Sequence, residues 1–230
     1  MSGEPEPDRG RQESFRKLLR SLRVWDTELP HFDPATAPAD PLPLFQDWLC
    51  AAARAGTPEP HTMTLATADA SGRPSARTVM LNDADERGWH FATHRTSRKG
   101  RDLAARPEAA LAFYWPAVGR QVRVQGRVTA ASTAETRADL ARRSTSALVL
   151  ALLDRQSEVL PSCATLERTV EAAWERAERE PDAPADSWRL YVLAADEVEF
   201  YQGDVRCRHV RLRYRRDSPE APWATDLLWP

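Results

Sequence analysis

The sequence predicts an α+β protein built on a small barrel of antiparallel strands with helices at its periphery. From residue 62 onward, short runs alternate apolar and polar residues between turn sequences, as in antiparallel strands with one wet face. Stretches with helical spacing of apolar residues lie before these strands and between groups of them. Neither GxGxxG nor GxxxxGK[ST] occurs, which disfavours a doubly wound nucleotide-binding fold.

The first 39 residues are expected to form a flexible arm with a short helix, and residues 40–230 a single domain. Residues 1–12 are polar and rich in Pro, Gly and Glu, a composition typical of disorder. Residues 13–24 place Phe and Leu at helical intervals, which predicts the short helix. A stretch punctuated by proline follows and leads into the domain.

The elements of the domain follow from periodicity and turn residues. Asp40 is the expected cap, and Gly56 the expected stop, of an amphipathic helix over residues 44–56. A short helix is expected to begin near Ser97, and two or three more within residues 133–180. Strands are expected at residues 62–69, 75–81, 88–94, 109–116, 119–132, 187–194, 196–203, 207–216 and 223–229.

Composition excludes several classes of function. The 230 residues carry a net charge of −2, so the chain lacks the basic footprint of a nucleic-acid binder. No apolar run approaches the roughly 20 residues that cross a bilayer, and the N-terminus lacks the apolar core of a secretion signal, so we expect a cytoplasmic protein. Cys50, Cys163 and Cys207 form no CxxC pair, and the five histidines show no metal-ligand spacing, so we expect no metal.

The stretch THRTSRKGRDLAARP, residues 93–107, is a candidate anion site. A strand ending at Thr93 leads to a helix start that carries Arg98 and Lys99. Unpaired N–H groups, hydroxyls and two cations could hold a phosphate there, although a solvated helix start that happens to carry two basic residues explains the pattern about as well. Basic residues are unfavourable at a helix start, which mildly favours a bound anion.

Three further stretches are candidates only in combination. Arg77 begins an otherwise apolar strand, and Gln156 and Ser157 offer amide and hydroxyl groups after a helix. In RCRHVRLRYRR, residues 206–216, a period of two would place His209 beside Arg211 on one face. Taken alone, the three stretches are better explained as an edge strand, a helix-to-loop junction and a strand with a solvated face, respectively.

Several motifs in one order resemble the pyridoxine/pyridoxamine 5'-phosphate oxidase family over Asp40 to Pro230. They are DPLPLFQDWL, MTLATADASGRPSARTVML, FATHRTSRKGRDLA, FYWPAVGRQVRVQGRV, RQSE, EFYQG and RLRYRR. The resemblance implies an FMN-binding split β-barrel of six to eight antiparallel strands with peripheral helices, and a homodimer with FMN at its interface.

The resemblance also implies cofactor contacts, with Arg98 and Lys99 clamping the FMN phosphate and Tyr201 standing where the family usually has Trp. The implied FMN contacts are Arg77, Thr78, Val79, Met80, Leu81, Asn82, Ala92, Thr93, Arg98, Lys99, Gln121, Gln156, Ser157, Tyr201 and Arg211.

The substrate side departs from the family pattern. Where the vitamin-B6 oxidases have a Lys, a Tyr, an Arg, a Ser and an Arg-x-His, this chain has Asn82, Asp139, Arg143, Ala147, and Cys207, Arg208 and His209. Three of the four residues that should hold the substrate phosphate are therefore replaced. Each lost charge-assisted bond typically costs about 1.5–3 kcal/mol, so we expect weak phosphate binding.

The expected function is that of an FMN-dependent oxidase with a rebuilt substrate pocket, similar to the flavin oxidases of phenazine biosynthesis. Hydride would pass from a C–H next to nitrogen of a small carboxylated heterocycle to FMN, with O2 as acceptor. Arg143 and His209 are the candidates for holding the substrate carboxylate. The alternatives are a true pyridoxine/pyridoxamine 5'-phosphate oxidase, and a flavin- or PLP-binding protein without oxidase activity.

Overall fold

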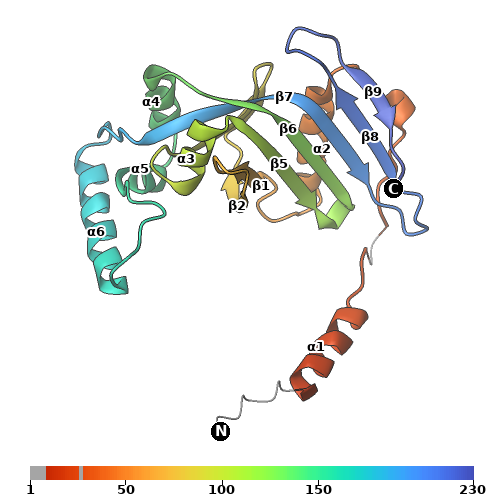
Figure 1. The fold of residues 1–230 in the computed structure, drawn as a ribbon, viewed down its shortest axis with the longest axis horizontal. Helices are drawn as coiled ribbons and strands as arrows, with labels where there is room; N and C mark the ends of the chain where they lie inside the picture. Colours follow the sequence, from red (N-terminus) through yellow and green to blue (C-terminus); the bar gives the residue numbers. More distant parts are fainter. Residues whose placement is uncertain (1–8, 26–27) are drawn as a thin grey trace.

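The computed structural model describes residues 9–25 and 28–230, and its body is a curled antiparallel sheet (Figure 1). Its strands are β1 (Thr62–Ala68), β2 (Pro74–Met80), β3 (Asp83–Asp85), β4 (Gly88–His94), β5 (Glu108–Trp115), β6 (Arg120–Ala130), β7 (Trp188–Gln202), β8 (Val210–Arg215) and β9 (Ala224–Leu227). The order is β2-β1-β5-β6-β7-β4-β3, with β8 pairing β7 and β9. The α+β half-barrel confirms the predicted fold class, with nine strands in the described residues rather than six to eight.

Helices gather mainly at one end of this sheet. They are α1 (Arg9–Ser21), α2 (Pro41–Arg54), α3 (Arg98–Ala105), α4 (Thr133–Ala141), α5 (Thr145–Leu152) and α6 (Cys163–Arg179), with short 3-10 turns at Pro34–Thr36 and Pro116–Val118. Helices α4, α5 and α6 lie at one end of β7, while β8 and β9 lie at the other (Figure 1). Helix α1 projects away from the sheet. None of the described helices is long and apolar enough to cross a membrane.

The core explains why the alternating strands hold together. Phe45 of α2 is 1% exposed, and its ring packs edge-on against Phe113 of β5 and Trp89 of β4. Trp48, one turn further along α2, packs in the same way on Phe200 of β7. Along β6 the valines are buried while the intervening Gln and Arg side chains are more exposed, as predicted. This apolar layer anchors the strands that carry the candidate site residues.

Most predicted boundaries hold, and the chemistry of the helix ends is as expected. The Asp40 carboxylate accepts a hydrogen bond from the Leu42 N–H at 2.8 Å and caps α2. Gly56 follows the helix with φ +75°, a conformation that favours glycine. The disorder predicted for residues 1–12 is wrong for residues 9–12, which belong to α1, while residues 1–8 lie outside the described residues.

Two strand predictions are wrong for identifiable reasons. Residues 187–194 and 196–203 form one strand, β7, because the register against β6 shifts at Gln125/Gly126 and absorbs the polar residue Asp196 as a bulge. Residues 207–209 are not part of β8 but of the turn before it, where Cys207 has φ +60°. The predicted alternation of Cys207, His209 and Arg211 therefore fails for the first two.

Two backbone hydrogen bonds fix the segment that follows β2, one to β4 and one to the residue before β1. The Asn82 N–H donates to the His90 carbonyl at 2.7 Å, and the Leu81 N–H donates to the His61 carbonyl at 2.9 Å. Strand β2 is one edge of the sheet and β4 lies next to the opposite edge in the strand order, so the Asn82–His90 bond curls the sheet toward closure. The curl places Asn82 between β4, through its bond to His90, and α4, through its contact with Asp139.

Candidate functional site

The residues predicted to form an anion site gather at the start of α3, where a cation is buried. Lys99 is 7% exposed, and its Nζ donates to the Gln156 Oε1 at 2.7 Å. The Thr93 hydroxyl donates to the same oxygen at 3.1 Å, and the Arg98 N–H donates to the Ser157 Oγ at 3.1 Å. The structure thus brings together five of the predicted cofactor contacts, from β4, α3 and the segment between α5 and α6.

The geometry of the helix start sets the direction of these groups. The Ser97 side chain accepts from the Gly100 N–H and caps α3. A Cβ on Gly100 would lie 2.5 Å from the carbonyl oxygens of His94 and Arg95, so only glycine permits this tight entry into the helix. The cap leaves Arg98 and Lys99 in the first turn, where the backbone dipole adds positive potential.

Electrostatics make this cluster a fitting site for an anion. Burial, and then repulsion from Arg77, lower the pKa of Lys99 to about 8. Among the described residues no carboxylate makes a hydrogen bond or ion pair with Lys99, and Arg98 acts on a carboxylate only at longer range, where it helps to lower the pKa of Asp69. A buried cation without a carboxylate is costly, and a bound phosphate would reverse that cost. The residues present therefore fit the phosphate of a flavin nucleotide.

Arg77 lies beside this cluster on the inward face of β2. Its guanidinium donates to the Leu65 carbonyl at 3.2 Å, the Thr67 hydroxyl at 2.8 Å and the Ser75 hydroxyl at 2.8 Å. The buried Asp102 carboxylate lies 3.8 Å away. Burial lowers the pKa of Arg77. Within this chain Arg77 braces β1 against β2 and adds positive potential toward Lys99.

The other predicted contacts from the strands face in different directions. On β2, Thr78 and Met80 are exposed, while Val79, and Leu81 just after the strand, pack against the core. Ala92 of β4 is half-buried. The exposed pair offers a surface that a flavin ring or a second subunit could cover.

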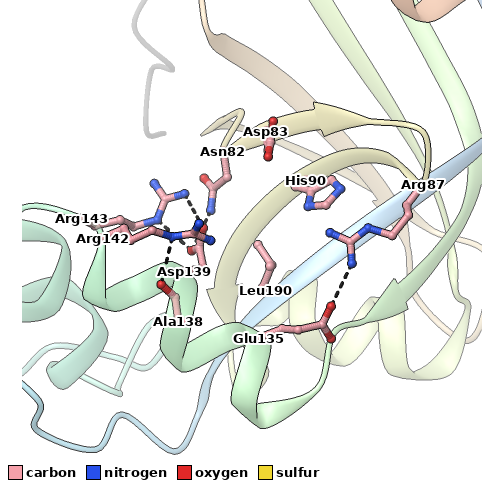
Figure 2. A pocket seen from close by; sticks show the side chains of 10 residues that line it. All are labelled: Asn82, Asp83, Arg87, His90, Glu135, Ala138, Asp139, Arg142, Arg143 and Leu190. Atoms are coloured by element: carbon pink, nitrogen blue, oxygen red, sulfur yellow. Dashed lines mark hydrogen bonds and ion pairs between the residues drawn. The ribbon is translucent and has the colours of Figure 1, made fainter.

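A separate pocket of about 370 Å³ holds three of the predicted substrate residues (Figure 2). Arg143 donates to both oxygens of Asp139, from Nε at 2.8 Å and from Nη2 at 2.9 Å. The Asn82 amide donates to the same carboxylate at 3.4 Å. Ala147, in the first turn of α5, does not line this pocket.

The opposite wall of the pocket carries its own ion pairs. Arg87 donates to Glu135 of α4 at 2.8 Å (Figure 2) and also pairs with Asp85. The buried His90 ring lies with its Nε2 2.8 Å from an Asp85 oxygen. Arg87, His90 and Glu135 were not predicted as site residues. The sequence offered one signal for them, which is proximity to predicted substrate residues. Arg87 and His90 follow the strand that precedes Asn82, and Glu135 lies one turn before Asp139 in α4.

The remaining predicted residues form a third cluster around the turn between β7 and β8. The His209 ring lies 5.4 Å from the Tyr201 ring, and its Nδ1 accepts from the Asp204 N–H at 3.0 Å. Arg211 donates to the buried Glu199 at 2.8 Å, which raises the pKa of Arg211. Gln121 pairs with Tyr201 across β6 and β7. Cys207 and Arg208 are exposed in the turn.

Sequence reasoning missed Trp25, which belongs to the N-terminal arm. Its indole meets the His209 ring edge-on at 5.6 Å between centroids. A Cβ on Gly203 would lie 2.6 Å from the Trp25 ring, so a residue without a side chain permits this contact. The sequence signal for this contact was the pair Gly119 and Gly203, because a glycine beside a strand or turn can leave room for another side chain to pack against the backbone.

One chain does not bring Arg143 and His209 together. Leu190 lines the Asp139 pocket, and Tyr201 contacts His209, and both belong to β7. Eleven steps along a strand at about 3.3 Å per residue separate the two clusters by on the order of 30 Å. A single site that uses both residues needs a second copy of the chain.

The curled antiparallel sheet is that of the split-barrel proteins, and the cation cluster at the start of α3 fits the phosphate of a cofactor. Residues 49–177 match the family model described as "Pyridoxamine 5'-phosphate oxidase", and residues 188–230 match "Pyridoxine 5'-phosphate oxidase C-terminal dimerisation region". The chain belongs to the pyridoxine/pyridoxamine 5'-phosphate oxidase family, whose members are oxidoreductases that use FMN. The predicted family is therefore confirmed.

Individual relatives agree with this assignment. Proteins named pyridoxine/pyridoxamine 5'-phosphate oxidase are 45% identical over 213 residues in Burkholderia orbicola (strain MC0-3) and 46% identical over 214 residues in Burkholderia multivorans. Both alignments cover 92% of this chain and 99% of the relative.

Two solved structures resemble the chain. The crystal structure of PhzG from Burkholderia lata 383 in complex with tetrahydrophenazine-1-carboxylic acid superposes with a TM-score of 0.81 at 30% identity, covering 89% of this chain and 100% of PhzG. An FMN-binding protein related to pyridoxamine 5'-phosphate oxidase, from Nostoc punctiforme, superposes with a TM-score of 0.68 at 19% identity, covering 84% and 100% of the two chains. The second likeness concerns the fold alone.

Proposed function

We propose that this protein is an FMN-dependent oxidase that acts on a C–H next to nitrogen in a small carboxylated heterocycle, in phenazine-type biosynthesis, with O2 as acceptor. The observation that carries the cofactor assignment is the buried Lys99, whose hydrogen-bond partner in the described part of the chain is a neutral amide and not a carboxylate. The observation that favours this substrate class is the Asp139–Arg143 pair, together with the 30% identical PhzG, whose crystal structure holds a reduced phenazine carboxylic acid.

Several side chains would hold the cofactor. Lys99 and Arg98 would bind the phosphate, with Ser157 and the N–H groups at the start of α3 as further donors. The predicted contacts on β2 and β4 would flank the ring system. When bound, FMN supplies the acceptor for the hydride. The protein's own contribution would be to hold the substrate carbon close to the flavin and to keep water out of the pocket.

A homodimer is part of this proposal. Residues 188–230 match a dimerisation region, which supports association through β7, β8 and β9. In such a dimer, the His209 cluster of one subunit would complete the Asp139 pocket of the other. Arg143 and His209 could then face one substrate, although one chain keeps them apart.

Pyridoxine/pyridoxamine 5'-phosphate oxidase is the second candidate. It is favoured by the 45% identical relatives that carry this name. Against it stand the replacements at Asn82, Asp139, Ala147 and Cys207, which remove donors for a substrate phosphate. A non-catalytic flavin- or PLP-binding protein is the third candidate, and the same experiment separates all three.

The test is anaerobic flavin reduction. The purified protein is loaded with FMN and mixed with pyridoxamine 5'-phosphate, pyridoxine 5'-phosphate or a reduced phenazine carboxylic acid, and loss of flavin absorbance is followed. We expect rapid bleaching by the phenazine compound, and recovery with release of hydrogen peroxide when O2 is admitted. Faster bleaching by pyridoxamine 5'-phosphate would establish the second candidate. Retained flavin without bleaching by any amine would support the third.

A further inference from the structure

The Asp139 pocket contains a cation that is already neutralised by the protein. Arg143 uses Nε and Nη2 in a bidentate pair with Asp139, at 2.8 and 2.9 Å. This is the strongest geometry for a guanidinium and a carboxylate. The pair is also sheltered, since the exposed fractions of the two side chains are 27% and 14%. The Asn82 amide adds a longer hydrogen bond, at 3.4 Å, to the same Asp139 oxygen that accepts from the Arg143 Nε.

The rest of the pocket is balanced in the same way. Its lining includes three carboxylates and three guanidinium groups, so the formal charge is zero. Arg87 is paired with Glu135, and Asp83 accepts from its neighbour's N–H. The Arg142 guanidinium donates to the Ala138 carbonyl (Figure 2), and within residues 9–25 and 28–230 it pairs with no carboxylate. A ligand that brings two negative charges would find a single uncommitted cation there.

We infer that Asp139 is a specificity-determining residue, an internal counter-ion that occupies Arg143 and limits the pocket to substrates with a single negative charge. A carboxylate would be accommodated, whereas a phosphate dianion would have to compete with Asp139 for Arg143 and would suffer its repulsion. The inference rests on the proposed function only in treating this pocket as the substrate pocket.

The test compares a phosphorylated ligand with its dephosphorylated form, without requiring turnover. We would measure binding of 4-deoxypyridoxine 5'-phosphate and of 4-deoxypyridoxine, which lack the oxidisable substituent, to the full-length protein by equilibrium dialysis. Asp139→Asn keeps the size and the Asn82 contact but removes the charge. Asp83→Asn is the matched control, because it removes one negative charge from the same pocket without releasing an arginine.

Asp139→Asn is expected to raise the ratio of the affinity for 4-deoxypyridoxine 5'-phosphate to the affinity for 4-deoxypyridoxine by at least about tenfold. Asp83→Asn is expected to change the same ratio by less than about twofold. Adding Arg143→Gln to Asp139→Asn should abolish the gain. An equal shift in both single variants, no shift with Asp139→Asn, or a gain that survives loss of Arg143 would overturn the inference. A protein without FMN or oxidase activity would refute the proposed function but leave this comparison interpretable.

Discussion

Lys99 is expected to destabilise the flavin-free protein, so that Lys99→Met should stabilise it. The side chain is 7% exposed, and its pKa is lowered from 10.5 to about 8, by burial first and by Arg77 second. At about 1.36 kcal/mol per pKa unit, holding this ammonium charged costs about 3 kcal/mol of folding free energy. Methionine avoids that cost but loses the hydrogen bond to Gln156, worth about 1 kcal/mol. The variant should therefore gain about 2 kcal/mol at neutral pH.

The difference in unfolding free energy between the wild type and Lys99→Met should depend on pH. Between pH 8 and 10.5 the unfolded chain binds more protons at this lysine than the folded chain does, so wild-type stability rises with pH relative to the variant. Below pH 8 the full cost remains, and above 10.5 it disappears. Urea unfolding of both proteins from about pH 6.5 to 10.5 measures this difference. Parallel stability curves for the wild type and Lys99→Met would refute the reasoning.

The chain offers an unusually clean control. Lys17, on the exposed α1, is its only other lysine, so Lys17→Met removes a charge of the same type from a solvated position. That variant should show no pH-dependent difference from wild type. With two lysines, reductive methylation with carbon-13 also allows NMR titration of each. Addition of FMN should raise the pKa of Lys99 above about 8, because the phosphate favours the ammonium.

Three more substitutions test other parts of the structure. Arg98→Ala should weaken FMN binding by about 10- to 100-fold in a fluorescence titration, while flavin-free stability stays within about 0.5 kcal/mol; unchanged FMN affinity would contradict the clamp. Gly126→Ala should lower the free energy of unfolding by about 2 kcal/mol or more, because its Cβ would lie 2.1 Å from the Ala194 carbonyl oxygen; wild-type urea resistance would show that the bulge can relax. Phe45→Ala should cost about 3–5 kcal/mol, and a loss under about 1 kcal/mol would mean that α2 does not anchor the core.

The sequence predicts most of the sheet because period and burial coincide there. Strand β4 matches its prediction over residues 88–94, and the valines of β6 point inward as expected. The polar residue Asp196 misled the prediction for β7, since a bulge looks like a strand break in a single sequence. The turn at Cys207 was missed because a run of arginines and apolar residues also suits a strand.

Contacts in the candidate site could be predicted from the sequence only where the two residues are close along the chain. The Asp139–Arg143 pair has i,i+4 spacing across the C-terminal end of α4, so it could have been predicted from the sequence. The pairing of Lys99 with Gln156, by contrast, joins residues 57 positions apart and depends on how α5 returns toward β4. No local pattern contains that information. The family resemblance supplied both residues, and the fold shows how one can contact the other.

Strand β7 runs from the Asp139 pocket to the His209 cluster, with one bulge at Asp196 on the way. In the proposed dimer, each β7 would contribute Leu190 to one reaction centre and Tyr201 to the other. The two centres would then be connected by the two β7 strands, each of which is held by hydrogen bonds to its neighbours in the sheet. A ligand that displaces β7 at one centre would therefore displace it at the other. The first and the second ligand should then bind to the dimer with measurably different affinities.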